Sequence, residues 1–376
     1  AEKTVMVGTS LEDLELPESL TVTVQINPET VADSLYDSED KERTVDIPVA
    51  WSSQPEYDMD TEGEYVFTPV IEGYIVNTEL PRITVVVRAV MMRQAFSLMS
   101  GDNVAQNIST GQVYPTLQGA VDEVKNGETI QLLEDIVLNA TVTIGHKSFT
   151  LDLNGKTLDS GDKTAIQYNG NGILTIDDSS AGGKGRITGE VESNNYNPSV
   201  VRLTGSGTLN IKGGMVEATG VAGCTINLGM YGKVNVSGGG TVQTTNYNGT
   251  AISNSWYSTV NVSGGTVQAT GSGGTAIFSN NKITISGNAL VSSAANQWNS
   301  ATVFLSALGS LDIKGGTVQN IAANGVTIRS YSLNSASINI SGGTLGAPNG
   351  TAIYNEETGK ITISGNAVVT GANSNS

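Results

Sequence analysis

Residues 234–239 have the sequence Val-Asn-Val-Ser-Gly-Gly, and residues 260–265 repeat it without a change. The phrase joins two alternating apolar residues and a polar residue to a Gly-Gly or Gly-Asn turn, and another apolar stretch follows. Seven copies occur, and they begin at Leu209, Val234, Val260, Ile283, Leu311, Ile338 and Ile361. Their starts lie 25, 26, 23, 28, 27 and 23 residues apart. A unit this short cannot bury its own apolar face, so we expect the copies to stack, and period-2 alternation predicts that they stack as strands.

A second apolar stretch accompanies the later copies of the phrase. It has the form Gly-Thr-Ala-Ile or a close variant, and examples are residues 249–252, 274–277, 325–328 and 350–353. Stacked coils would align these residues in columns about 4.8 Å apart. The sequence therefore predicts that such columns form the core.

The composition suits a repetitive β structure and excludes several kinds of partner. The chain has 376 residues with 45 glycines, 15% charged residues and 5% aromatic residues, which is typical of strands with many turns. The net charge is −17, and residues 1–95 hold 19 acidic and 6 basic residues. Neither part has the positive balance that attracts nucleic acid or an anionic lipid surface, so we expect neither partner.

The first residues, the single cysteine and the apolar content of the chain bear on where the protein is located in the cell. Cys224 is the only cysteine, so no intrachain disulfide can form. No run of about 18 apolar residues occurs, which argues against direct membrane insertion. The start at Ala1-Glu2 suits a chain whose export signal has been removed. We therefore predict a secreted or cell-surface protein.

Residues 1–94 are predicted to form a first domain. Short alternating stretches at 4–7, 20–26, 45–51, 65–68 and 83–87 indicate a small antiparallel β-sandwich. The segments 49–53, 57–58 and 63–69, which hold Trp51, Tyr57, Tyr65 and Phe67, resemble the bacterial Ig-like domains of large exported proteins. In that family the Trp and Tyr/Phe positions fill the core between two sheets. The resemblance implies a spacer or interaction module.

One acidic segment of this domain imitates a metal site. Asp58-Met-Asp60-Thr-Glu62-Gly63 matches the first six positions of an EF-hand loop. Such a loop needs a bidentate Glu at position 12, where this chain has Pro69. We interpret the segment as a solvated turn, and we predict no metal site and no cofactor; calcium has no support in the sequence.

Residues 95–376 are predicted to form the second domain. Leu117, Ala120, Val121 and Val124 share one face of a helix predicted at about 116–125, with Thr116 as N-cap and Asn126-Gly127 as the stop. Strands are predicted at 129–133, 141–144, 150–153 and 173–176.

The phrases at 117–133 and 151–158 resemble the entry to the right-handed parallel β-helix of pectate-lyase-like proteins. In those proteins an amphipathic helix covers the first coil and its open sheet ends. The predicted fold class is therefore mainly β: an N-terminal Ig-like β-sandwich, then a right-handed parallel β-helix with an N-terminal capping helix.

Pectate-lyase-like scaffolds host lyases and glycosidases, which need a base beside calcium or carboxylates on adjacent coils. The repeats hold few acidic residues: Glu217, Asp312, Glu356 and Glu357. Asp177-Asp178 resembles the double Asp of polygalacturonases, but the third Asp, the Gly-His-Gly and the Arg-x-Lys of that family are missing, and Ser179–Gly183 predicts a turn. We predict no catalytic residue, and we interpret four other candidates as packing or solvated residues: His146, Arg202, Cys224 and Arg329.

The aromatic residues give the best functional hypothesis. Three aromatic-Asn pairs lie 51 residues apart, each five residues before a second-strand apolar residue. At two coils per interval they would form a column spaced by about 10 Å, which suits an extended glycan. A second group, Tyr231, Trp256-Tyr257 and Tyr331, follows the second strand. The alternative is that each ring covers a loop of its own coil. The predicted ligand-binding residues are Tyr196, Asn197, Tyr247, Asn248, Trp256, Tyr257, Trp298 and Asn299.

These observations predict a non-catalytic, adhesin-like bacterial protein, secreted or at the cell surface. Its expected partner is a polysaccharide or a host or cell-surface glycan, bound through the β-helix loops. Two alternatives stay open: a polysaccharide lyase or glycoside hydrolase with a site assembled from distant coils, and a structural stalk.

Overall fold

The computed structural model describes residues 2–6, 9–14, 16–25, 42–61, 63–71, 80–88, 103–191, 199–297, 300–306, 308–331, 337–356 and 359–372. The chain is mainly β, with 54% of its residues in strands and 3% in helices. It forms two compact units, Ala1–Met92 and Arg93–Ser376.

The N-terminal unit contains a four-stranded sheet and a separate strand pair. The sheet has the order β1-β6-β5-β4, and β2 pairs with β3 in antiparallel fashion. The bounds are β1 Glu2–Met6, η1 Glu12–Leu14, β2 Ser19–Gln25, β3 Glu42–Pro48, β4 Ala50–Gln54, β5 Gly63–Val70 and β6 Ile83–Arg88. Alternate residues of β5 and β6 point inward, so Tyr65, Phe67, Val85 and Val87 form the core with Leu14, and Trp51 packs against it.

Two details differ from the prediction for this unit. The predicted strand 45–51 is two strands, because the chain leaves the β2 partner at Val49 and continues as β4 beside β5. The pairing is also not wholly antiparallel, since β1 and β6 run parallel. A parallel pair needs a long connection, and almost the whole unit lies between these two strands.

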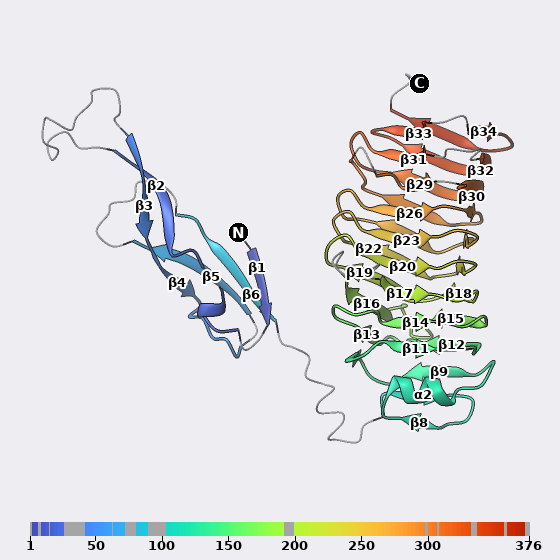
Figure 1. Cartoon of the computed structure of the whole chain (residues 1–376), viewed down its shortest axis with the longest axis horizontal. Helices are drawn as coiled ribbons and strands as arrows, with labels where there is room; N and C mark the ends of the chain where they lie inside the picture. The colour runs from blue at the N-terminus through green and yellow to red at the C-terminus, as the bar shows by residue number, and fades with distance from the viewer. Residues whose placement is uncertain are drawn as a thin grey trace, which may run out of the picture. The chain divides into compact units, whose positions relative to one another are not determined.

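The second unit is a β-solenoid of right-handed type with about nine turns. Each coil gives one strand to a nine-stranded parallel sheet, which Figure 1 shows rising from β11 to β33. The strands of this sheet are β11 Val142–Ile144, β14 Ile166–Tyr168, β17 Ser199–Leu203, β20 Cys224–Leu228, β23 Thr250–Asn254, β26 Thr275–Ser279, β29 Val303–Ser306, β31 Val326–Tyr331 and β33 Thr351–Asn355.

The seven repeat phrases supply the next strand of each coil. These strands are β18 Thr208–Ile211, β21 Lys233–Val236, β24 Thr259–Val262, β27 Lys282–Ile285, the first part of β30 Ser310–Asn320 and of β32 Ser337–Ala347, and β34 Lys360–Ile363. The apolar stretch after the turn forms β19 Met215–Thr219, β22 Thr241–Thr244, β25 Thr266–Ala269, β28 Leu290–Ser293, the rest of β30 and β32, and β35 Val368–Gly371. The earlier coils use β7 Ala105–Asn107, β8 Val113–Tyr114, β9 Thr129–Leu132, β10 Ile136–Val137, β12 Phe149–Asp152, β13 Thr157–Asp159, β15 Ile173–Asp177 and β16 Arg186–Glu190.

The predicted core columns are confirmed. Val201, Ile226, Ile252 and Ile277 lie in register on successive strands of the nine-stranded sheet, and all four are fully buried. The glycine turns follow from the same close stacking. Gly265 has φ +66°, and a Cβ added to it would stand 2.2 Å from the carbonyl oxygen of Gly240 in the preceding coil. Only glycine fits at such a point.

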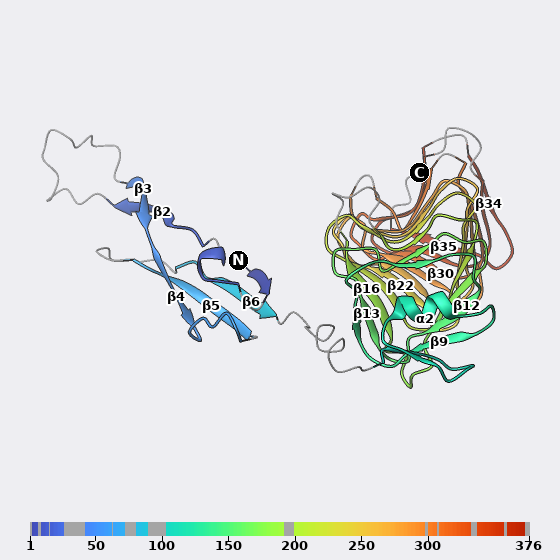
Figure 2. The same ribbon diagram turned by 60° about the horizontal axis from the view of Figure 1, so that its bottom comes forward.

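Helix α2, Leu117–Glu123, lies beside β9 at the first end of the solenoid (Figure 2). Thr116 is its N-cap as predicted, since its Oγ1 accepts a hydrogen bond from the Gly119 N–H at 3.1 Å. Leu117, Ala120 and Val121 are buried. Among the described residues, no helix has the length and apolar character needed to cross a membrane.

Candidate functional site

Large apolar side chains gather at the turns that lead from the nine-stranded sheet into the repeat phrases. The turn after β20 carries Met230 and Tyr231, and the equivalent turn after β23 carries Trp256 and Tyr257. Their exposed fractions are 50% and 58% in the first turn and 45% and 58% in the second. We call these four residues the aromatic corner. Contiguous exposed apolar groups of this kind often mark an interaction site.

The backbone of the aromatic corner is held in an unfavourable conformation. Tyr231 has φ +68° and Tyr257 has φ +62°, which is the left-handed region that favours glycine. A non-glycine residue there costs on the order of 1–3 kcal/mol. The chain carries tyrosine at both positions, so the turn presents a ring where glycine would be the less strained choice. Strain of this kind motivates a functional hypothesis.

Tyr231 and Tyr257 lie on successive coils, and their rings stack on each other. Their ring centroids lie 5.3 Å apart and their planes differ by 11°. Each ring therefore covers one face of the other, and both side chains are still 58% exposed. In the next coil the turn after β26 holds only Asn280 and Asn281, against four residues in the turns that carry the tyrosines. Asn280 has the equivalent position there, two residues before Lys282, so the aromatic stack does not continue past Tyr257.

The predicted ligand-binding residues do not form one group. Tyr247 precedes β23 and is 51% exposed, whereas Trp256 and Tyr257 follow the same strand. A five-residue strand at about 3.3 Å per residue puts the two groups at least about 15 Å apart. Tyr247 makes its own contact, because Gln297 Nε2 donates to its hydroxyl at 2.9 Å. The other predicted residues, Tyr196, Asn197, Trp298 and Asn299, lie outside the described residues, so the 51-residue column stays a prediction.

Asn248 has a backbone role at the corner of its coil. Its φ is +54°, and the equivalent residues of neighbouring coils, Ala222, Gly273 and Asn324, have φ +57°, +72° and +58°. Asparagine tolerates this left-handed conformation better than most residues. The repeated Asn after an aromatic residue is thus explained in part by the turn, and its role in ligand binding stays a prediction.

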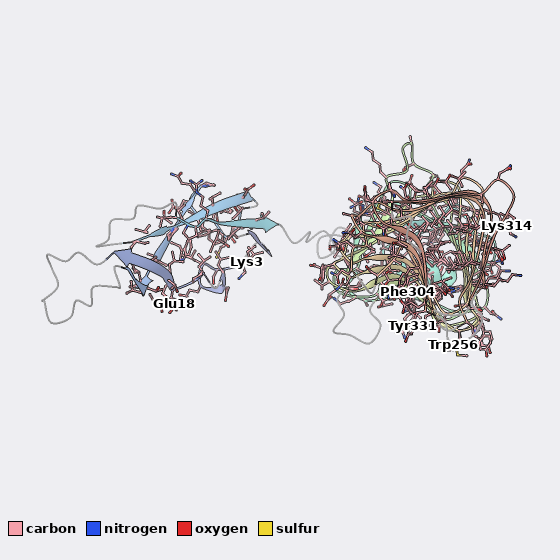
Figure 3. The ribbon with its side chains drawn as sticks, turned by 90° about the horizontal axis from the view of Figure 1, so that it is seen from above. Lys3, Glu18, Trp256, Phe304, Lys314 and Tyr331 are labelled. Atoms are coloured by element: carbon pink, nitrogen blue, oxygen red, sulfur yellow. The ribbon has the colours of Figure 1, made fainter. Side chains whose placement is uncertain are left out.

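Sequence reasoning missed a second aromatic column, on the outer face of the nine-stranded sheet. Phe278 and Phe304 are paired in register on β26 and β29 and stack at 5.4 Å. In the next coil Arg329 is in register with Phe304, and its guanidinium lies over the ring of Tyr354 of the following coil at 5.1 Å and pairs with Glu356. Figure 3 shows Trp256, Phe304 and Tyr331 along the same side of the solenoid. The identical position of the phenylalanines within successive coils was the available clue.

The carboxylates of the candidate Asp178 and of Asp152, which lies in β12, act as hydrogen-bond acceptors. Asp178 Oδ2 accepts from the Gly185 N–H at 2.6 Å, and Oδ1 accepts from the Gly155 N–H at 2.8 Å. Burial raises the pKa of Asp178, but the bonds from Gly185, Ser180 and Gly155 outweigh burial and leave the pKa below its ordinary value. Asp152 is held in the same way: burial raises its pKa, and hydrogen bonds from Gln131, Ser179 and Asn154 bring it below the ordinary value.

The surroundings of His146, Cys224 and Asp58 also suit a structural role. His146 Nδ1 lies 3.1 Å from Asn171 Oδ1 of the next coil. Burial raises the pKa of the Cys224 thiol to about 11, so it stays protonated at neutral pH. Asp58 accepts from Thr61 Oγ1 at 2.6 Å and from the Asp60 N–H at 3.0 Å, within a turn between β4 and β5. No group of three or more His, Cys, Asp or Glu side chains suited to a metal ion occurs among the described residues.

Comparison with known proteins does not assign the chain to a family. A scan of protein-family models, a search of curated proteins and a search of solved structures each found no match.

Proposed function

We propose that the chain is a non-catalytic, adhesin-like glycan-binding protein, secreted or held at the bacterial cell surface. In this proposal the N-terminal unit is an Ig-like spacer, and the solenoid belongs with the pectate-lyase-like β-helices, with α2 as the cap of its first coil. The observation that carries the proposal is the aromatic corner: four exposed apolar side chains, two of them in strained backbone positions. Sugar rings bind to aromatic faces of this kind, and both stacked tyrosines are 58% exposed.

A glycan array with the full chain tests this proposal, compared with the double variant W256A/Y257A. We expect the variant to lose most of the wild-type binding, because it removes two of the exposed rings of the aromatic corner. Y247A serves as the matched control, since it removes an equally exposed ring at the other end of β23. Circular dichroism checks that each variant keeps its strands.

The outcomes separate the proposal from its alternatives. Loss of binding in Y247A alone would move the site to the predicted 51-residue column. Wild-type binding by both variants would refute the aromatic site. An assay for new reducing ends and unsaturated products on the bound glycans tests the lyase or hydrolase alternative, and product formation would replace the non-catalytic proposal. A protein that binds no glycan in any form would leave the structural stalk as the better description.

A further inference from the structure

The solenoid has a basic face, although the chain as a whole is acidic. From Ser199 onward the described residues include seven basic and three acidic side chains, within a chain of net charge −17. Five of the seven are exposed lysines that lie on the repeat-phrase strands or directly after them. These lysines, which we call the lysine face, are Lys212, Lys233, Lys282, Lys314 and Lys360.

Strand register places the lysines in two outward columns. Lys233, Lys282 and Lys360 share one column, which passes through Thr259, Ser310 and Ser337. Lys212 and Lys314 follow the last buried residue of β18 and of the first part of β30. At about 4.8 Å per coil, Lys233 and Lys282 are about 10 Å apart, and the face extends for about 30 Å.

Between these columns runs a ladder of amide side chains. Asn235 Nδ2 donates to Asn210 Oδ1 at 2.7 Å, and Asn261 Nδ2 donates to Asn235 Oδ1 at 2.9 Å. The ladder fixes the amides in one orientation along the face. Polar groups held in this way can hydrogen-bond a ligand without first being ordered.

The lysines are largely without acidic partners. Among the described residues the face contains one ion pair, Lys282 Nζ to Asp312 Oδ2 at 3.8 Å, and the Lys282 side chain is still 55% exposed. Apart from Asp312, the acidic residues aligned on these strands lie on earlier coils, at Asp152 and Asp177. The positive charge is therefore available to a ligand that lies along the later coils.

The lysine face meets the aromatic corner at the edge where the turns enter the repeat strands. Tyr231 comes two residues before Lys233, and Tyr257 has the same place before Thr259. Figure 3 shows Trp256 near this edge of the solenoid, with Lys314 on the adjacent side. A ligand chain along the solenoid axis can thus touch ring faces and lysines together.

We propose that the lysine face binds a linear anionic glycan, with carboxylate or sulfate groups spaced along a chain that crosses successive coils. This inference rests on the proposed glycan-binding function and names the ligand class. Charge density favours a glycan over nucleic acid. Duplex DNA has one charge per about 1.7 Å, whereas five lysines over about 30 Å give one per about 6 Å, which suits about one charge per sugar ring.

The experiment measures binding of the full chain to chondroitin sulfate, heparin and hyaluronan, and to chondroitin made neutral by desulfation and carboxyl reduction. We expect the charged polymers to bind at least about tenfold more tightly than the neutral one in low salt, and the difference to shrink in 0.5 M salt through screening. The triple variant K233Q/K282Q/K314Q is expected to bind the charged polymers about tenfold more weakly. Its control, K156Q/K163Q/K184Q, has the same net charge but leaves the face intact, and is expected to bind as the wild type does.

Each outcome decides the inference. Equal binding of charged and neutral polymers, or equal loss in the two triple variants, would overturn the lysine face as a ligand site. The proposed function would survive that result if W256A/Y257A still lost binding to neutral glycans. Failure of every charged polymer to bind would also overturn the inference. Tighter binding of single-stranded DNA than of any glycan, abolished by K233Q/K282Q/K314Q, would assign the face to nucleic acid instead.

Discussion

Asp178 allows a sharp test of whether the adjacent acidic pair is structural or catalytic. Its carboxylate accepts three backbone N–H groups, from Gly155 at 2.8 Å, Ser180 at 3.2 Å and Gly185 at 2.6 Å. The substitution Asp178→Asn keeps the size of the side chain but replaces one oxygen with an NH₂ group. That group cannot accept a hydrogen bond and would face an N–H donor. At about 1 kcal/mol for a lost bond and at least as much for the unpaired donors, we expect D178N to lower the free energy of unfolding by about 2 kcal/mol.

The effect has a predictable pH dependence. Because the pKa of Asp178 is lower in the folded chain than in the unfolded one, the carboxylate stabilises the fold above its unfolded pKa of about 3.9. That stability is lost as the pH falls through the folded pKa. The difference between the wild type and D178N should be complete at pH 7 and should shrink below about pH 4.

Urea unfolding followed by circular dichroism, at pH 7 and pH 3, measures both quantities. Asp177→Asn is the matched control, because Asp177 accepts a hydrogen bond only from the N–H of its neighbour Asp178, at 2.9 Å, among the described residues. We expect D177N to cost less than about 1 kcal/mol. If D178N were as stable as the wild type at pH 7, or more stable, the structural interpretation would be refuted. A gain in stability is what removal of a catalytic carboxylate often produces.

Two further predictions concern packing. Since burial raises the pKa of Cys224 to about 11, iodoacetamide at pH 8 should modify the folded chain at least about tenfold more slowly than the urea-unfolded chain; equal rates would contradict the raised pKa of this partly buried thiol. Ile361 and Ile338 occupy one column, but Ile361 is 40% exposed and Ile338 1%. Ile338→Thr should cost about 2–3 kcal/mol and Ile361→Thr less than about 1 kcal/mol in urea unfolding, and similar costs would show that depth in the solenoid does not control the effect.

The architecture of the second unit was predictable because its constraints are local. Alternation places Val234 and Val236 inside a strand, and the following glycines supply the backbone freedom for the turn, so one phrase determines one strand and one corner. Stacking then follows from the repeat alone. The N-terminal unit lacks such repetition. The parallel neighbours β1 and β6 are distant in sequence, and no local pattern indicated that they pair.

The candidate site was less predictable, because side chains were assigned to columns by counting residues through turns of unequal length. The turn after β26 has two residues, whereas the turn of the coil before it has four and that of the coil after it has three, which shifts any count that passes through it. Counting from strand residues is safer. Phe278 and Phe304 occupy one position of their strands, and strand alignment alone would have placed them together.

The repeat phrase restricts the residue type at its inward positions but not at its outward ones. Its inward positions accept only Val, Leu or Ile, because each must fill the same column of the core. Its outward positions have no such constraint, and the first of them is Lys233, Thr259, Lys282 or Ser310 in successive coils. Folding would be served as well by threonine at every one of these positions, since threonine favours strands and lysine does not. The fold alone does not require lysine at these positions, and a ligand with regularly spaced negative charges is the reason that we propose for it.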